Sequence, residues 1–442
     1  MIPALLLAAA TLVSPQYTGN TSAGRREAMW FEHDGISTNP GVKDRFSVVK
    51  PVAASEGNAP LLVVLHWRGA GMPGKGVDMQ TQVSDDKDAV FSAPDDFFIL
   101  NLDDIRDYNI IFGRTHDDYW WGATAEYKGP VEEDVQRLYL KPTPCEERIL
   151  ATVEWVAANF PIDRKRIYLC GNSMGGQAAT AIGLAHGDVF AAVNANVPAT
   201  PWYAVGRLGL DDDSNAARFP DPPIYVEWSG VNDPWSRDRH RVIDSLQSRK
   251  WPHIVLWGDF GHCGHVSKAR EKNDLVERFD WLSVRLDEAY PAFTSASCDD
   301  VLPWPFSVWK PKTRWFGPCA GDIYEAEMEP GHRAPKAGGV NAFFRWRNIK
   351  DGESGFAMEL YIASPEELCT TQFAVPEAAV ADVAIRRIQS ASIRAATQVE
   401  WSYGEKTGTV PKQPGGPVII ENLPLTRNKE TLYLKSVTCK EE

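Results

Sequence analysis

Residues 162–176, IDRKRIYLCGNSMGG, decide the fold of this chain. The apolar run at 167–170 has the composition of a buried strand, and a pattern of small residues typical of a helix begins directly after Ser173. Residues 171–175 match G-x-S-x-G in the strand, turn and helix order that holds a nucleophilic serine at a sharp turn. Glycines on both sides let the helix pack closely against the strand while the hydroxyl stays exposed. We predict Ser173 as a nucleophile.

The sequence around this motif alternates short apolar runs with helical patterns. Residues 145–160 place Ile149, Val153 and Val156 on one helical face. Alternating strands and helices are typical of a mostly parallel sheet covered on both faces. With a serine turn at a strand end, the pattern predicts an α/β-hydrolase fold, a doubly wound and mostly parallel sheet, over residues 30–295. The strand-like runs lie at 45–52, 59–67, 95–102, 166–173, 191–197, 224–230 and 253–259.

The predicted acid and base follow the serine in the chain order of this fold: serine, acid, histidine. Asp233 comes just after a strand-like run, where catalytic groups of such sheets collect. The next strand-like run ends in FGHCGH at 260–265, which offers His262 and His265. A serine hydroxyl needs a histidine to take its proton and a carboxylate to orient that histidine. We predict the triad Ser173, Asp233 and His262, with His265 as the alternative base or as a residue of the substrate cleft.

The oxyanion of an acyl-transfer reaction needs two backbone N–H donors. The serine turn supplies the N–H of Met174, and the loop after an early strand supplies the second donor. That loop reads LHWRGAG at 65–71, so either Trp67 or Arg68 is the predicted donor. Many hydrolases have His-Gly-Gly at this place, and the departure leaves the choice open. We predict His66 as a structural residue of the loop.

Sixteen tryptophans are present, and most of them must belong to the core. A flat aromatic ring also stacks on sugar rings and on aromatic acyl groups. Trp120 and Trp121, in DDYWWGA, follow a strand-like region and are predicted as possible walls of the substrate cleft. The tryptophans of residues 301–318 are predicted to pack between domains.

The composition is that of an acidic globular protein. Hydrophobic residues make up 43% and charged residues 24% of the chain, which allows a large core. The formal net charge of −13 disfavours nucleic acid and anionic membranes as partners, because both are negatively charged. No Cys or His spacing resembles a zinc site, so we predict no metal and no cofactor. A neutral or apolar substrate fits the charge better.

The first residues indicate export. Residues 1–13 are apolar and residues 14–23 are small and polar, as in a signal peptide, although no basic residue stands before them. We predict a signal peptide at 1–23, with cleavage after Ala23 or, alternatively, near Ala10, and a secreted or periplasmic protein. The apolar stretch is too short to span a bilayer as a stable anchor.

After about Asp300 the sequence changes character. Residues 301–318 are rich in Pro and Trp, which excludes a regular helix, and we predict a linker or strap at 296–320. Short alternating runs separated by Gly, Pro and Asn then predict a β-sandwich domain at 321–442. These runs lie at 340–349, 355–364, 382–393, 397–404, 416–423 and 431–438.

Seven cysteines cannot all pair, so export would leave at least one thiol free. Cys170 lies inside an apolar strand and is predicted as a buried free thiol. The candidates for one or two bridges in the last third of the chain are Cys298, Cys319, Cys369 and Cys439.

The motifs together resemble the esterases of carbohydrate esterase family one and the related polyhydroxybutyrate depolymerase-type hydrolases. The resemblance covers roughly residues 44–285 and is carried by the serine turn with its preceding Asp-x-x-Arg-Ile-Tyr, by LHWRGAG, by SGVNDPW and by FGHCGH. It implies hydrolysis of feruloyl or acetyl esters on polysaccharides through an acyl-enzyme and without a cofactor.

Other functions share the same residues. A polyester depolymerase or a serine peptidase would use the same triad, because a fold does not determine its substrate. A protein that only binds carbohydrate, on a hydrolase scaffold, is the alternative without catalysis. The order of serine, acid and histidine favours an enzyme, and we expect a polysaccharide or a small ester as its partner. The oligomeric state cannot be inferred from the sequence.

Overall fold

A computed structural model describes the chain in segments, which are residues 16–23, 26–33, 44–52, 57–67, 83–84, 90–103, 120, 141–199, 201–231, 233–236, 238–262, 272, 274–276, 278–303, 308–311, 324–327, 337–353, 355–368 and 373–437.

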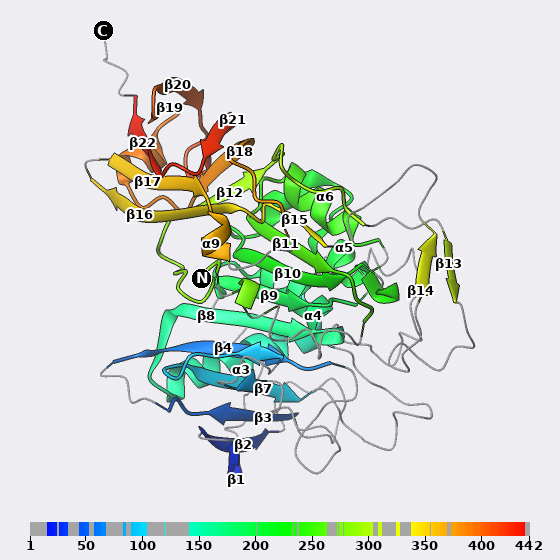
Figure 1. Ribbon diagram of the computed structural model, residues 1–442. Coiled ribbons are helices and arrows are strands. Elements are labelled where there is room, and N and C mark those ends of the chain that lie inside the picture. The colour runs from blue at the N-terminus through cyan, green and yellow to red at the C-terminus, as the bar shows by residue number, and fades with distance from the viewer. Residues whose placement is uncertain are drawn as a thin grey trace.

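A ten-stranded sheet forms the centre of the molecule (Figure 1). In spatial order its strands are β1 (Gln16–Ala23), β2 (Arg26–His33), β3 (Asp44–Val49), β7 (Phe98–Asp103), β4 (Ala59–Leu65), β8 (Ile162–Asn172), β9 (Ala192–Asn196), β10 (Ile224–Gly230), β11 (His253–Gly258) and β15 (Gly338–Val340). Every neighbouring pair from β7 to β11 is parallel. The pairs at both ends are antiparallel. A sheet that is parallel at its centre, with the serine turn after β8, has the α/β-hydrolase fold that the sequence predicts.

Helices cover one face of this sheet. They are α3 (Pro144–Asn159), α4 (Met174–Ala178), the π-helix η3 (Ala179–Gly183), α5 (Trp202–Leu208) and α6 (His240–Ser248). Two short 3₁₀ helices, η4 (Asp213–Arg218) and η5 (Pro234–Ser236), lie in the connecting loops. The opposite face packs against residues 276–290 beside β4 and β8. Burial on both faces explains why these strands are continuous apolar runs.

Helix α3 begins where its sequence signals place it. The Thr143 hydroxyl accepts a hydrogen bond from the Glu146 N–H at 3.2 Å, which satisfies one of the free donors of the first turn. Pro144 occupies the first turn, where no N–H is needed. The predicted face of Ile149, Val153 and Val156 is buried against the sheet. The cap and the apolar face therefore agree on one helix.

A β-sandwich follows in the last third of the chain. One of its sheets has the order β12 (Tyr290–Thr294), β18 (Ala378–Arg386) and β21 (Val418–Thr426). The other has the order β16 (Phe344–Gly352), β17 (Gly355–Ile362), β22 (Glu430–Ser436), β19 (Gln398–Tyr403) and β20 (Lys406–Pro411). Alternate residues of both sheets are buried in one core, as in a sandwich. The smaller elements are the strand pairs β5 (Val83–Ser84) with β6 (Phe91–Ser92) and β13 (Val308–Pro311) with β14 (Tyr324–Glu327), and the helices α9 (Pro365–Leu368) and α10 (Ala391–Ala395).

The hydrolase and the sandwich share strands and core. Strand β12, which precedes the predicted boundary at 295/296, pairs with β18 of the sandwich. Strand β15, which follows that boundary, extends the central sheet beyond β11. Trp228 and Leu256 of the central sheet lie in the same apolar core as the sandwich strands. The two halves are therefore interleaved, and Figure 1 shows the sandwich at the β11 end of the central sheet, far from β1 and β2.

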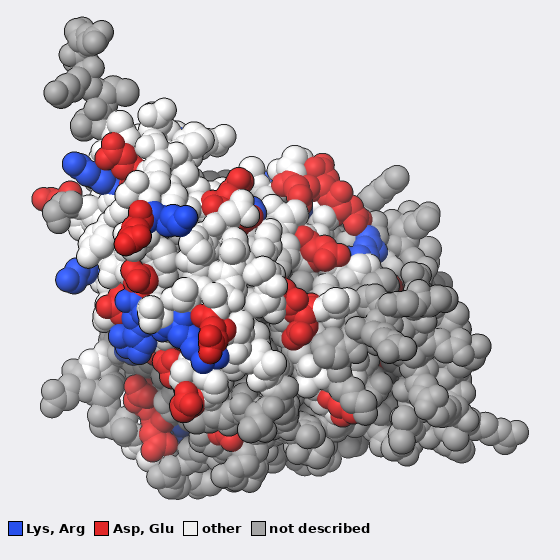
Figure 2. Space-filling model, turned by 45° about the horizontal axis from the view of Figure 1, so that its top comes forward, with Lys and Arg blue, Asp and Glu red and all other residues white. Residues whose placement is uncertain are grey.

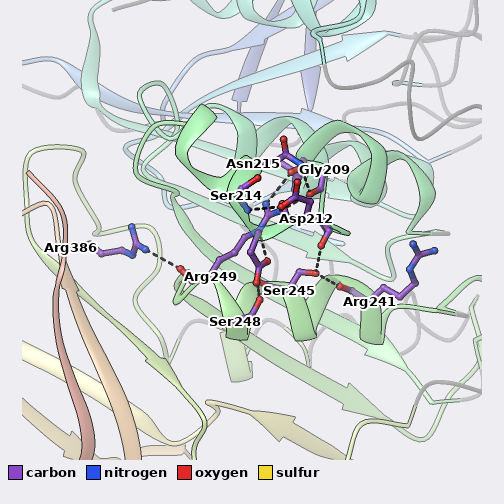
Figure 3. A network of polar contacts seen from close by, with 12 residues as sticks. Gly209, Asp212, Ser214, Asn215, Arg241, Ser245, Ser248, Arg249 and Arg386 are labelled. Atoms are coloured by element: carbon purple, nitrogen blue, oxygen red, sulfur yellow. Dashed lines mark hydrogen bonds and ion pairs between the residues drawn. The ribbon is translucent and has the colours of Figure 1, made fainter. Parts of the chain in front are cut away.

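Buried arginines strengthen this junction. Arg386 of β18 donates to Lys250 O at 2.9 Å and to Arg249 O at 3.2 Å, the second contact being drawn in Figure 3. Its Nη1 lies 2.5 Å from Asp221 Oδ1. The Arg249 guanidinium in turn donates to Gly209 O at 2.7 Å. These contacts fix the sandwich to the loops at one end of the hydrolase.

Some expectations for local structure differ from the structure. The predicted run at 382–393 is a strand only to Arg386, and residues 391–395 form α10. Strand β20, with the sequence KTGTVP, was not predicted because it is an edge strand without buried alternation. Residues 16–23, placed in the predicted signal peptide, form β1 and pair with β2. Cleavage after Ala23 would remove this strand, whereas cleavage near Ala10 would leave it.

Two cysteines for which the sequence makes predictions lie in the described segments, and both carry free thiols. Cys170 is fully buried with a free thiol, as predicted, and Cys298, a predicted bridge candidate, also carries a free thiol. Burial raises the pKa of Cys298 to about 12, so this thiol is protonated at neutral pH. Cys319, Cys369 and Cys439 lie outside the described residues.

Charges of both signs are mixed on one face of the molecule. Figure 2 shows one face, where Lys and Arg side chains lie among Asp and Glu side chains.

Within the segments that the structure describes, no helix has the length and apolar character needed to cross a membrane.

Candidate active site

Ser173 lies at a tight turn between β8 and α4. Its φ is 55° and its ψ is −112°, a conformation that non-glycine residues rarely adopt and that costs about 1–3 kcal/mol. The flanking glycines are required sterically. A Cβ on Gly171 would lie 2.1 Å from Gly175 O, and a Cβ on Gly175 would lie 2.0 Å from Leu65 O. Strand and helix thus approach so closely that no side chain fits between them.

The neighbouring strand β9 holds the turn in place. The Ser173 N–H donates to Asn196 O at 2.9 Å, and the Ala199 N–H donates to Ser173 O at 3.0 Å. The side-chain amide of Asn196 donates to Asn172 Oδ1 at 2.8 Å. Val197, the next residue, has a φ of 39°, which is unusual for a β-branched side chain. Ser173 and Val197 thus both have a positive φ directly after a strand, and each is held by the neighbouring strand, since the Val197 N–H donates to Trp228 O of β10 at 2.6 Å.

The predicted histidine lies within hydrogen-bond distance of both the predicted serine and the predicted acid. Ser173 Oγ lies 2.7 Å from His262 Nε2, and His262 Nδ1 lies 2.7 Å from Asp233 Oδ2. A carboxylate can only accept, so Nδ1 donates to Asp233 and Nε2 is left to accept from the serine hydroxyl. His262 and Asp233 are buried, whereas Ser173 is half-buried. This arrangement can take the proton of Ser173 as its oxygen attacks a carbonyl group.

Asp233 is fixed in the loop between β10 and η5. Its N–H donates to Gly230 O at 3.2 Å, and its Oδ1 accepts from the Trp235 N–H at 2.8 Å. Its side chain is fully buried. Because a different donor meets each carboxylate oxygen, the carboxylate can face His262 in one orientation only.

Trp235 is a large side chain beside the triad that the sequence patterns did not single out. The residue is 37% exposed, and its ring meets the His262 ring at 62°, with 6.4 Å between the centroids. Nothing in WSGVNDPWS separates this tryptophan from the other fifteen, because its place depends on how the loop after Asp233 turns. The structure puts it at the surface next to His262.

The loop after β4 lies beside the start of α4, where the oxyanion donors are predicted. Met174 is the first residue of α4, so its N–H has no carbonyl partner one turn earlier in the helix. A Cβ on Gly175 would lie within 2.7 Å of His66 O, which places this loop against the helix start. Trp67 is half-buried there. Arg68, the alternative second donor, lies outside the described residues.

His66 and Trp120 hold the backbone of this loop by hydrogen bonds. His66 Nδ1 lies 2.7 Å from Trp67 O, and Trp120 Nε1 donates to His66 O at 2.9 Å. Burial lowers the pKa of His66 to about 4, so the ring is neutral and Nδ1 donates to the carbonyl. Trp120 is fully buried, so it does not form a wall of an open cleft as the sequence suggested. Its indole instead fixes the backbone of the loop that carries Trp67.

The remaining site predictions fall on other parts of the chain. His265, the alternative base, and Trp121, a predicted cleft residue, lie outside the described residues. Among the side chains that are described, no group of three or more His, Cys, Asp and Glu is arranged to hold a metal ion.

Residues 140–221 match the model of the prolyl oligopeptidase family. This segment includes α3, β8, the Ser173 turn and α4. The finer resemblance to carbohydrate esterases and polyhydroxybutyrate depolymerases has no counterpart in this match and stays a prediction. No curated protein matches the chain.

Several solved structures are similar to the chain at low identity. The S-formylglutathione hydrolase from Agrobacterium tumefaciens is 15% identical, with 58% of this chain and 96% of that chain covered and a TM-score of 0.40. The fluorophosphonate-binding serine hydrolase FphF from Staphylococcus aureus is 14% identical, with 59% and 99% covered and a TM-score of 0.38. The acylaminoacyl peptidase from Pyrococcus horikoshii is 12% identical, with 62% and 42% covered and a TM-score of 0.34.

The strand order, the serine turn and the family match agree on the class of protein. The chain is a serine hydrolase of the α/β-hydrolase type.

Proposed function

We propose that the chain hydrolyses carboxylic esters, with Ser173 as nucleophile, His262 as general base and Asp233 as the acid that orients the base. The observation that carries this proposal is the line of two 2.7 Å contacts from Ser173 Oγ through the imidazole to Asp233. In the first step Ser173 Oγ bonds to the ester carbonyl carbon, and its proton passes to His262 Nε2. The carbonyl oxygen becomes an oxyanion, held by the Met174 N–H and by a second donor, Trp67 or Arg68.

Collapse of this intermediate breaks the ester C–O bond, and the alcohol leaves with the proton that His262 held. Water then attacks the acyl-enzyme while His262 takes a proton from it, and the acid is released as Ser173 regains its proton. Asp233 stays ionised and stabilises the imidazolium in both halves of the cycle. The fixed contacts of the Asp233 carboxylate, one to Trp235 N and one to His262, suit this role.

We further propose feruloyl or acetyl esters on polysaccharides as substrates and an extracellular or periplasmic site of action. Trp235 supports an aromatic or sugar-bearing substrate, because this exposed residue has its indole beside His262 and offers a flat apolar surface next to the reacting bond. The net charge of −13 supports a neutral substrate rather than a polyanion. The residues at the start of the chain, which have the pattern of a signal peptide, support export.

The test of the reaction is hydrolysis of p-nitrophenyl acetate by the wild type and by Ser173→Ala. We expect the wild type to be active and the variant to lose at least about 10³-fold in kcat. Ser283→Ala, which changes a serine of an exposed turn bonded to Asp280 O, is the matched control and should retain full activity. Equal rates for wild type and Ser173→Ala would overturn the proposal.

The test of the substrate class compares release of ferulate from methyl ferulate with release of acetate from acetylated xylan. A preference for either supports the polysaccharide proposal and separates its two forms. Activity on poly-3-hydroxybutyrate alone would instead identify a polyester depolymerase. Binding of xylan without hydrolysis of any ester would identify the carbohydrate-binding alternative.

A serine peptidase is the second candidate, and the match of residues 140–221 to the prolyl oligopeptidase family favours it. Amide and ester hydrolysis use the same acyl-enzyme, but an amide needs its leaving nitrogen protonated before the C–N bond breaks. Hydrolysis of Ala-Pro-p-nitroanilide with a kcat/KM above that for p-nitrophenyl acetate would establish a peptidase. Loss of both activities in Ser173→Ala would show that one site performs them.

A further inference from the structure

A buried polar cluster lies on β10, beneath the loop that carries Asp233. Tyr225, Glu227 and Ser229 alternate along the strand, so their side chains point to the same face of the sheet. Ser229 Oγ donates to Glu227 Oε1 at 2.8 Å, and Tyr225 OH donates to Glu227 Oε2 at 2.5 Å. Arg239 donates to the same carboxylate through Nε at 3.2 Å and through Nη2. All four side chains are fully buried.

One end of this cluster reaches the helix that follows the nucleophile. Thr180, in η3 directly after α4, has its Oγ1 3.0 Å from Tyr225 OH. The Thr180 hydroxyl donates to Gly176 O at 2.9 Å. Arg239 Nη2 also donates to Tyr225 OH at 2.7 Å. The Tyr225 phenol therefore contacts both the helix that follows Ser173 and the Glu227–Arg239 ion pair.

The other end of the cluster closes the loop of the catalytic acid. The Ser236 N–H donates to Asp233 O at 3.1 Å, and the Arg239 N–H donates to Ser236 O at 3.1 Å. Two successive hydrogen-bonded turns thus lead from Asp233 to Arg239. The Arg239 side chain then binds Glu227 on β10, the strand that precedes the loop. The loop is held at its first residues by β10 and at its end by the ion pair.

The ion pair is better suited to fixing geometry than to adding stability. Removing two charges from water often costs more than their attraction returns, even with good hydrogen bonds. In the part of the chain that the structure describes, Arg239 Nη1 and the neighbouring Ser236 Oγ are buried without a hydrogen-bond partner. Apolar side chains of similar size would fill the space at less cost, but they would not fix where the loop ends.

We propose that Glu227 and Arg239 are positioning residues for Asp233, which keep its carboxylate aligned with His262 Nδ1 by fixing the end of the acid loop to β10 and to the nucleophile's helix. This inference rests on the proposed role of Ser173, His262 and Asp233. A misplacement of about 1 Å at a reacting group can cost about 100-fold in rate, so an unfixed loop should slow the chemical step. It should leave binding of a small ester unchanged, because neither residue lines the surface of the site.

The test is the double variant Glu227→Met/Arg239→Met in the full chain. We expect a melting temperature near that of the wild type, since paired apolar replacements of buried ion pairs often preserve stability. For p-nitrophenyl acetate we expect kcat to fall at least about tenfold while KM stays within about twofold. The low-field proton resonance of His262 Nδ1–H, assigned by its absence in His262→Ala, should broaden or disappear.

The matched control is another buried ion pair, formed by Glu146 of α3 and Arg207 of α5. Arg207 donates to Glu146 Oε2 through Nε at 2.8 Å and to Oε1 through Nη2 at 2.8 Å, and both side chains are buried. This pair contacts no part of the acid loop in the described hydrogen bonds. Glu146→Met/Arg207→Met should therefore keep the wild-type kcat and the His262 resonance.

Two results would overturn the positioning role. The first is a folded Glu227→Met/Arg239→Met variant with kcat within about twofold of the wild type and an intact resonance. The second is an equal loss of kcat in the Glu146→Met/Arg207→Met control. If the double variant does not fold, Glu227→Gln, which has the same size, carries the same comparison. An inactive wild type would refute the proposed function instead, and the resonance would still report whether the ion pair aligns Asp233 with His262.

Discussion

Replacement of Gly175 by alanine tests whether the serine turn depends on the contact between α4 and β4. The added Cβ would lie 2.0 Å from Leu65 O, 2.5 Å from Leu65 C and 2.7 Å from His66 O. All three are backbone atoms in or beside the central sheet, so none can rotate away as a side chain could. The start of α4 must move instead.

The size of this movement gives the expected loss. Real Cβ atoms essentially never lie closer than 3.0 Å to such atoms, so α4 must shift by about 1 Å relative to β4. Because Met174 begins this helix and Ser173 precedes it, the proposed nucleophile and one proposed oxyanion donor move together. A displacement of about 1 Å costs about 100-fold in rate, which is about 2.7 kcal/mol of transition-state stabilisation.

The assay is kcat/KM for p-nitrophenyl acetate, with thermal unfolding measured on the same samples. Gly352→Ala is the control, because a Cβ there meets nothing within 4 Å. We expect Gly175→Ala to lose activity and some stability, and Gly352→Ala to change neither. A folded Gly175→Ala enzyme with a kcat/KM within about threefold of the wild-type value would refute the reasoning. The added Cβ would then fit between α4 and β4 without moving Ser173.

Three further outcomes are expected. Asp233→Asn should lower kcat roughly 10⁴-fold with little change in KM, because an amide cannot hold the imidazole in the required tautomer; a loss below about tenfold would contradict the assigned acid. Trp235→Ala should lower kcat/KM for methyl ferulate about tenfold relative to ethyl acetate, because the lost ring contact serves only the aromatic acyl group; equal losses on both esters would refute this contact. Burial lowers the pKa of His253 to about 4, so between pH 6.5 and 4 the unfolded chain binds a proton that the native protein does not. Stability should therefore fall by about 2 kcal/mol from pH 7.5 to pH 5 through this group, and urea unfolding of His253→Gln should show a smaller fall; an identical pH dependence in the variant would count against it.

The serine turn could be predicted because its signal is local. The apolar strand, the glycines and the following helix are adjacent in the sequence, and each is required by sterics that involve neighbouring residues. Asp233 and His262, the proposed acid and base, could be placed beside Ser173 because parallel strands end at one edge of the sheet, so residues after β10 and β11 approach the residue after β8. Helix α3 was predicted nearly to its ends, since the helical spacing of its apolar residues is visible in the sequence.

Other parts of the site depend on contacts that the sequence does not display. Trp120 was expected at the cleft surface, but it is buried beneath the loop that follows β4, more than fifty residues earlier in the chain. Arg239 reads as one more charge in SRDRHR, and only the return of the acid loop to β10 buries it against Glu227. Trp235 likewise gains its place from the turn after Asp233. Long-range packing, not local pattern, assigns these side chains.

The interleaving of β12 and β15 with the two halves of the molecule has a consequence for synthesis on the ribosome. The outer edge of β11 stays unpaired until residues 338–340 have left the ribosome, and β12 stays unpaired until β18 follows. Unpaired strand edges invite pairing with other chains, so a nascent hydrolase half is at risk of aggregation while it waits. A chain that stops before residue 338 could not pair the outer edge of β11 at all. Strand β15 therefore closes the central sheet late, because the edge of β11 is covered only after translation has passed residue 340.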